Sequence, residues 1–170
     1  VAFYGLWALQ HRGQEGSGIV TSDGAKMYRH AEAGLVANVY HDDDIKALPG
    51  HIAIGHNRYA TSGGAGDHFN QPFLNKGQGF ALAHNGNLPD VSKLEDFLKT
   101  HKVSTKNLND TRMMEAAIAC YIKEGHDLQT AITKAYPLFT GVFSAVAMDN
   151  NQMIAFRDEC GIRPLSIGTL

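Results

Sequence analysis

The sequence predicts an α+β fold built in layers rather than an alternating β-α-β chain. Strand-like segments gather in the first half and at the C-terminal end, and two long helical patterns lie in a block between them. Such clustering of strands and helices is typical of the α+β class. The 170 residues suffice for one domain with a core of its own.

The first 90 residues begin with a helical pattern over residues 1–10. Phe3, Leu6 and Trp7 recur there at helical spacing, yet no capping residue precedes Val1, so we expect natural residues upstream. Four further kinds of element are expected before residue 91. They are a hairpin around Asp23-Gly24, a short acidic helix within 34–48, strands over 50–60 and 79–85, and a long loop over 62–79.

The remaining residues predict three helices followed by three strands. The helices are expected over 91–101, 111–125 and 127–136, and the strands over 141–149, 152–158 and 162–168. The helix over 111–125 is apolar on nearly every side, which indicates burial. Asn109 or Asp110 is expected to cap it, and Gly125 to end it.

Composition excludes several classes of function. The formal net charge is −2 and the chain carries no Lys/Arg run, so nothing indicates a nucleic-acid or membrane-surface partner. No apolar stretch is long enough to span a membrane. Two cysteines make no disulfide framework and favour a reduced, cytoplasmic compartment. The nine histidines lack metal-ligand spacing, so we expect them to be structural or exposed and expect no metal.

The segment AHNGNL, residues 83–88, contains a strong turn signal. Asn-Gly between apolar runs favours a hairpin, but the proline, cap and helical pattern that follow argue against one. A strand-to-helix turn remains open. The alternative is chemical, because the Gly86 N–H and the Asn85 side-chain amide could both point at one spot, as an oxyanion hole requires.

Other polar residues have a structural and a functional interpretation. Arg58 ends a strand beside the long loop, either in a surface ion pair or as a clamp for a carboxylate, with the Thr61 hydroxyl nearby. Asp110 is favoured as a helix cap over a substrate role. Cys120 lies in an apolar helix and Cys160 has no histidine near in sequence, so neither is favoured as a nucleophile.

Five segments in this order resemble the glutaminase domain of class II glutamine amidotransferases. They are HRGQEGSGI (11–19), GHNRYATSG (55–63), AHNGNL (83–88), LNDTRMM (108–114) and GIRPL (161–165). HRGQE and GIRPL favour the branch that delivers ammonia to phosphoribosylpyrophosphate in purine synthesis. The resembling stretch usually reads RGYDS in glucosamine-6-phosphate synthases and RGPD in asparagine synthetases.

The resemblance implies a four-layer α/β/β/α sandwich of the N-terminal-nucleophile hydrolase type over residues 1–170. In that class an N-terminal cysteine, with its own α-amine as base, attacks the glutamine amide and releases ammonia. An α-amine has a pKa near ~8, which suits this task near neutral pH. Water then hydrolyses the γ-glutamyl thioester.

The resemblance also implies roles for seven residues. They are Asn85 and Gly86 as the oxyanion hole, Arg58 with Thr61 for the α-carboxylate of glutamine, Asp110 for its α-ammonium, and Arg12 and Gly13 around the nucleophile. An amino acid offers one anion, one cation and one carbonyl, and these residues match all three.

The chain departs from the family pattern at both ends. Residue 1 is Val, and the family's opening Cys-Gly strand is missing, so we expect this fragment to be inactive by itself. A phosphoribosyltransferase domain, with its magnesium, is expected after GIRPLSIG, and the complete enzyme is expected to be a homo-oligomer. No cofactor is expected in residues 1–170. The alternatives are another class II amidotransferase or a non-catalytic glutamine-binding module.

Overall fold

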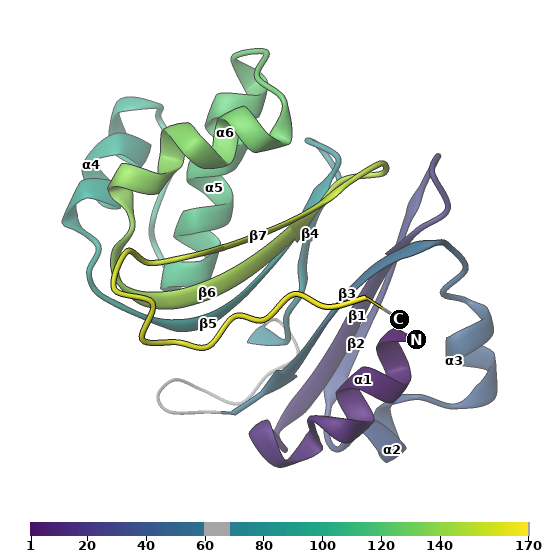
Figure 1. The fold of residues 1–170 in the computed structure, drawn as a ribbon. Coiled ribbons are helices and arrows are strands. Elements are labelled where there is room, and N and C mark those ends of the chain that lie inside the picture. The colour runs from purple at the N-terminus through teal and green to yellow at the C-terminus, as the bar shows by residue number, and fades with distance from the viewer. Residues whose placement is uncertain (60–68, 170) are drawn as a thin grey trace. The chain divides into compact units, whose positions relative to one another are not determined.

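The structure, a computed structural model, describes residues 1–59 and 69–169 (Figure 1). The chain forms two compact units. The first comprises Val1–Leu74, Gly79–Ala83 and Ala147–Met153, and the second comprises Asn75–Gln78, His84–Val146 and Ile154–Leu170.

The first sheet has three strands in the order β2-β1-β3. They are β1 (Gly16–Ser22), β2 (Met27–Ala33) and β3 (Ile52–Arg58). The central strand β1 is antiparallel to both neighbours, with Val20 opposite Arg29 on β2 and Ile54 on β3. Asp23 stabilises the β1–β2 turn by accepting hydrogen bonds from the Ala25 and Lys26 amides. The expected hairpin and the strand within 50–60 are therefore confirmed.

The first unit also contains short helical segments. They are α1 (Ala2–Ala8), the 3-10 turn η1 (Gln10–Arg12), α2 (Val36–Val39) and α3 (Asp42–Lys46). Of these, α1, η1 and α2 contact this sheet. Leu6 of α1 shares a buried cluster with Ile19 on β1 and with Val36, Val39 and Tyr40. The helix within 1–10 and the acidic helix are confirmed. Helix α2 was not expected, because four residues are too few to show a helical period.

The second sheet has four strands in the order β4-β5-β6-β7. They are β4 (Phe73–Asn75), β5 (Phe80–Asp90), β6 (Thr140–Met148) and β7 (Met153–Arg157). The expectation of loop throughout 62–79 is wrong for β4, and residues 62–68 of that loop lie outside the described residues. The expectation that β5 stops at residue 85 is also wrong, because the strand continues for five more residues.

The strand expected over 162–168 does not form. Pro164 has no N–H to donate to a neighbouring strand, which disfavours a strand at that position. The segment is held differently, since the Ser144 hydroxyl lies 3.1 Å from the Arg163 carbonyl and 3.2 Å from the Pro164 carbonyl.

The three expected helices of the second half are confirmed. They are α4 (Ser92–Thr100), α5 (Asp110–Lys123) and α6 (Leu128–Ala135), which the 3-10 turn η3 (Tyr136–Leu138) follows. Both α4 and α6 contact α5, whose side chains are mostly buried. Asn109, not Asp110, is its cap, because the Asn109 Oδ1 accepts the Arg112 amide at 2.8 Å. In the described residues, no helix is long and apolar enough to cross a membrane.

Candidate functional site

Asn85 and Gly86 lie inside strand β5, so AHNGNL forms neither a hairpin nor a strand-to-helix turn. A Cβ on Gly86 would lie 2.7 Å from the Phe143 Cα and closer still to the Val142 carbonyl oxygen on β6. Gly141 meets the backbone of Asn87 and Leu88 in the same way, a reciprocal register that makes β5 and β6 antiparallel. The glycine of the Asn-Gly pair therefore serves close strand contact, while the Asn85 side chain is exposed.

Asp110, the first residue of α5, lies against the same stretch of β5. Its Oδ2 accepts the Leu88 amide at 3.3 Å, and its Oδ1 accepts the Thr111 amide at 2.7 Å and the Thr111 hydroxyl at 3.3 Å. A carboxylate offers about four acceptor positions. These three donors from the described part of the chain leave one position, on Oδ2, which a substrate ammonium could use.

His84 is buried beside Asn85 and contacts the same helix. Its Nδ1 lies 3.0 Å from the Thr111 hydroxyl oxygen, and its side chain is 4% exposed. Burial lowers the pKa of His84, the Asp110 charge opposes that shift, and the Arg163 charge adds to it. We assign the proton to Nδ1, because the Thr111 hydroxyl has a single proton, donates it to Asp110, and can therefore only accept from His84. This agrees with a structural histidine, but the link to Asp110 was not foreseen.

The Asp158 carboxylate fixes the β6 residue that faces Gly86. Its Oδ1 accepts the Phe143 amide at 2.8 Å, and its Oδ2 accepts the Gly161 amide at 2.9 Å. These backbone donors hold the pKa of Asp158 below its usual value, the Phe143 amide contributing most. The Phe143 ring meets His84 edge to face, with centroids 6.1 Å apart. Asp158 was not foreseen in the sequence.

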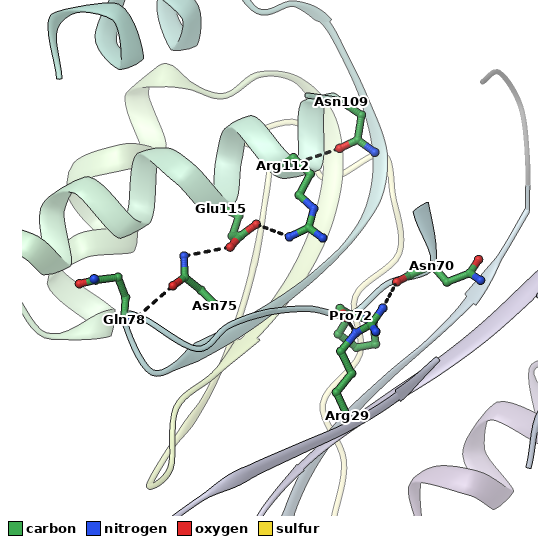
Figure 2. A network of polar contacts seen from close by, with 8 residues as sticks. All are labelled: Arg29, Asn70, Pro72, Asn75, Gln78, Asn109, Arg112 and Glu115. Carbon is green, nitrogen blue, oxygen red and sulfur yellow. Dashed lines mark hydrogen bonds and ion pairs between the residues drawn. The ribbon is translucent and has the colours of Figure 1, made fainter. Parts of the chain in front are cut away.

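Glu115 links the first turns of α5 to the last residue of β4 (Figure 2). Its Oε2 accepts from the Arg112 guanidinium at 2.8 Å, and its Oε1 accepts from the Asn75 side-chain amide at 2.9 Å. Asn75 in turn accepts the Gln78 backbone amide at 3.0 Å. Glu115 is buried, and both of its carboxylate oxygens accept hydrogen bonds, as a buried polar group requires.

In the first unit, Gly13 and Arg58 come together from two of the motifs. A Cβ on Gly13 would lie 2.7 Å from the Arg58 carbonyl carbon, and the Glu15 amide donates to the Arg58 carbonyl at 3.1 Å. The Arg58 guanidinium carbon lies 5.4 Å from the centroid of the Phe69 ring. Arg12 is exposed at the end of η1. Thr61 lies outside the described residues.

Three polar side chains that sequence reasoning missed hold this region. Gln10 accepts the Val36 amide at 2.7 Å and donates to the Gly13 carbonyl at 2.5 Å. Asn57, beside Arg58, donates to the Leu6 carbonyl at 2.8 Å and accepts the Ser17 hydroxyl at 2.9 Å. Figure 2 also shows Arg29 of β2 donating to the Pro72 carbonyl at 2.8 Å and the Asn70 carbonyl at 2.6 Å. For Gln10 and Asn57, the only signal in the sequence was their position next to the motif residues HRG (11–13) and Arg58.

The predicted site residues thus form two groups, one in each unit. The first holds Arg12, Gly13 and Arg58, and the second holds Asn85, Gly86 and Asp110. The described residues contain no group of three or more His, Cys, Asp or Glu side chains that could hold a metal ion. The second group combines a carboxylate with an exposed amide, and the first, described by itself, holds a guanidinium.

Comparison with known proteins defines the class. The profile of a glutamine amidotransferase domain family matches residues 56–170, more than half of the chain. The chain belongs to this glutamine amidotransferase domain family.

Its relatives narrow the comparison. The chain is 38% identical over 174 residues to the amidophosphoribosyltransferase of Bacillus subtilis, covering 100% of this chain and 36% of the relative. It is 37% identical to that of Methanocaldococcus jannaschii, covering 98% of this chain and 36% of the relative. It thus spans about a third of their length.

Solved structures agree on the fold. The glutamine phosphoribosylpyrophosphate amidotransferase of B. subtilis, complexed with ADP and GMP, matches with a TM-score of 0.85 at 37% identity. The match covers 99% of this chain and 36% of that one. A structure described as the allosteric regulatory enzyme of purine biosynthesis matches with a TM-score of 0.84, over 96% of this chain and 35% of that one. The α+β fold of N-terminal-nucleophile type is therefore confirmed.

Proposed function

We propose that this chain is the glutaminase domain of an amidophosphoribosyltransferase. In that role it binds glutamine and supplies ammonia that the rest of the enzyme adds to phosphoribosylpyrophosphate, the first step of purine synthesis. One contact carries the proposal. The amide of Leu88, two residues after Gly86, donates to the Asp110 carboxylate and so holds that carboxylate near Asn85 and Gly86. The relatives at 35–38% identity, named amidophosphoribosyltransferases, support phosphoribosylpyrophosphate as the compound that receives the ammonia.

Each end of glutamine has a proposed partner. Arg58 forms a two-point hydrogen bond with the α-carboxylate, helped by Thr61, because a guanidinium fork matches a carboxylate. Asp110 binds the α-ammonium with its remaining acceptor position. Asn85 and Gly86 donate to the amide oxygen as it gains negative charge, which lowers the barrier to attack. Arg12 and Gly13 surround the attacking group.

Neither cysteine of the chain suits the attacking role. The class uses a thiol whose own α-amine is the base, whereas Cys120 and Cys160 are internal residues whose nitrogens are amides. Cys120 is also buried in α5, and burial raises the pKa of its thiol, which disfavours the reactive thiolate. We therefore propose that residues 1–170 alone bind glutamine without releasing ammonia.

The remainder of the enzyme is proposed from the relatives' greater length. It would carry the phosphoribosyltransferase domain, and the complete protein would be a cytoplasmic homo-oligomer.

Calorimetry and ammonia release test the proposal together. The 170-residue chain should bind L-glutamine but release no ammonia, and the natural full-length protein should do both. Arg58→Ala should weaken glutamine binding at least tenfold, because it removes both hydrogen bonds to the carboxylate, whereas Arg58→Lys should recover only part of it. Binding without hydrolysis by the full-length protein would instead indicate a glutamine-binding module. If neither protein binds glutamine, both the glutaminase and the glutamine-binding module are rejected.

A further inference from the structure

We propose that His84 and Thr111 are positioning residues that fix the distance between the ammonium site and the amide site. The inference rests on the proposed function and deepens it. The two residues act through Asp110 and through the backbone of Asn85 and Gly86, and they do not touch glutamine themselves.

A directed chain of hydrogen bonds joins the two sites. The His84 Nδ1–H donates to the Thr111 hydroxyl over 3.0 Å, and that hydroxyl donates to the Asp110 Oδ1 over 3.3 Å. The last acceptor of this chain of hydrogen bonds is the Asp110 carboxylate. The chain thus gives Oδ1 of the Asp110 carboxylate a side-chain donor in addition to the Thr111 amide, and both donors restrict its orientation.

Two residues of β5, one on each side of Asn85 and Gly86, are linked to Asp110. His84 precedes Asn85 directly, and Leu88 follows Gly86 by two residues. Both links end on Asp110, the one from His84 through Thr111 and the one from Leu88 through its own amide to Oδ2 at 3.3 Å. A movement of Asn85 and Gly86 relative to Asp110, in the direction of the strand, would therefore break one of these two links.

Neither side chain caps the helix beside it. Asn109 already caps α5. Thr111 is 2% exposed, and its hydroxyl turns to Asp110 and His84. Both side chains are buried, and an aliphatic residue at either position would avoid the cost of burying polar atoms. Two buried polar side chains that hydrogen-bond to each other and end on the proposed substrate-binding carboxylate fit a positioning role.

The first test is glutamine hydrolysis by the natural full-length protein with substitutions at Thr111. Thr111→Val removes only the hydroxyl, so glutamine KM should rise about tenfold while kcat changes less than threefold. Thr111→Ser restores the hydroxyl and should stay within about twofold of the parent. Thr21→Val is the matched control, because Thr21 is also buried and its hydroxyl donates to the Pro49 carbonyl at 2.7 Å. It should lower Tm and leave KM unchanged.

A glutamine analogue separates positioning from general damage. Glutaramic acid keeps the carboxylate and the amide but lacks the α-ammonium, so its inhibition constant should be the same for Thr111→Val and the parent. Thr111→Val should also add nothing further in an Asp110→Asn background, since the hydroxyl acts through that carboxylate. Equal losses for glutamine and glutaramic acid would overturn the proposal, as would additive effects in the double variant.

His84 supplies a second pair of variants if Thr111→Val does not fold. The amide nitrogen of asparagine takes the place of Nδ1, so His84→Asn should keep KM within about threefold, whereas His84→Leu should raise it about tenfold. Equal KM values for the two would overturn the proposal. A parent protein that releases no ammonia from glutamine would reject the proposed function itself, a result that the parent assay shows before any variant is compared.

Discussion

The backbone amide of Leu88 on β5 donates to Oδ2 of Asp110 on α5 over 3.3 Å. This bond joins residues 22 positions apart in the sequence and places a carboxylate beside the Asn-Gly segment. The carboxylate is already oriented by protein donors, so the proposed binding of a substrate ammonium would require little reorganisation.

Replacing Asp110 by asparagine should remove the charge and keep the size of the side chain. Glutamine KM should rise more than tenfold, because a charge-assisted hydrogen bond is lost and the new amide must turn its oxygen to Leu88. Steady-state ammonia release by the full-length protein measures this. Inhibition by glutaramic acid, which has no ammonium, is the control and should change less than threefold. An unchanged glutamine KM would contradict the assignment.

Gly86→Ala should be strongly destabilising. The new Cβ would lie 2.7 Å from the Phe143 Cα, closer than real Cβ atoms approach, so β5 and β6 must separate. We expect a loss of more than about 3 kcal/mol in the free energy of unfolding, since backbone rather than a flexible side chain is in the way. Urea unfolding followed by circular dichroism checks it. Gly79→Ala is the matched control for the loss of a glycine, because a Cβ there meets nothing within 4 Å, although its φ of +67° adds some strain.

Caps on two helices should have equal effects on stability and unequal effects on binding. Asn109→Ala and Asp127→Ala each remove a side-chain acceptor, from the Arg112 amide and the Thr130 amide respectively. Each should cost about 1 kcal/mol, or roughly 2–4 °C in Tm. Only Asn109→Ala should also weaken glutamine binding several-fold, because α5 begins with Asp110. Equal binding by both variants would show that the start of α5 tolerates fraying.

Asp158 should make the protein sensitive to acid. Its folded pKa is lower than in the unfolded chain, because the Phe143 and Gly161 amides donate to the carboxylate. The stabilisation is therefore fully present above the unfolded pKa, near ~3.9, and is lost as the pH falls through the folded value. Urea unfolding at pH 3 to 7 should show a weaker acid dependence in Asp158→Asn, with lower stability at pH 7. Parallel curves for the two proteins would contradict this.

Local patterns were sufficient for most of the fold. The Asp23-Gly24 turn predicted the β1–β2 hairpin, and the apolar run after Asn109 predicted α5, because each depends on residues near in sequence. β4 is only three residues long and shows no period. The course of β5 through Gly86 depends on β6, more than 50 positions away, whose backbone leaves no room for a side chain.

The site was foreseen as residue types rather than as contacts. Arg58, Asp110 and the Asn-Gly pair were named from their motifs, yet Asp110 was favoured as a cap, and Asn109 has that role instead. His84 and Thr111 are 27 positions apart, and no local pattern encodes their hydrogen bond. Such pairings arise only when β5 and α5 pack together.

The reciprocal contact of Gly86 and Gly141 with the facing strand backbones has a consequence for protein engineering. A contact made by main chain cannot be reshaped by exchanging side chains, and neither glycine can be replaced by alanine without moving the facing strand. A redesign of the proposed glutamine site for a shorter or longer amide must therefore leave these two strand positions unchanged and alter residues elsewhere.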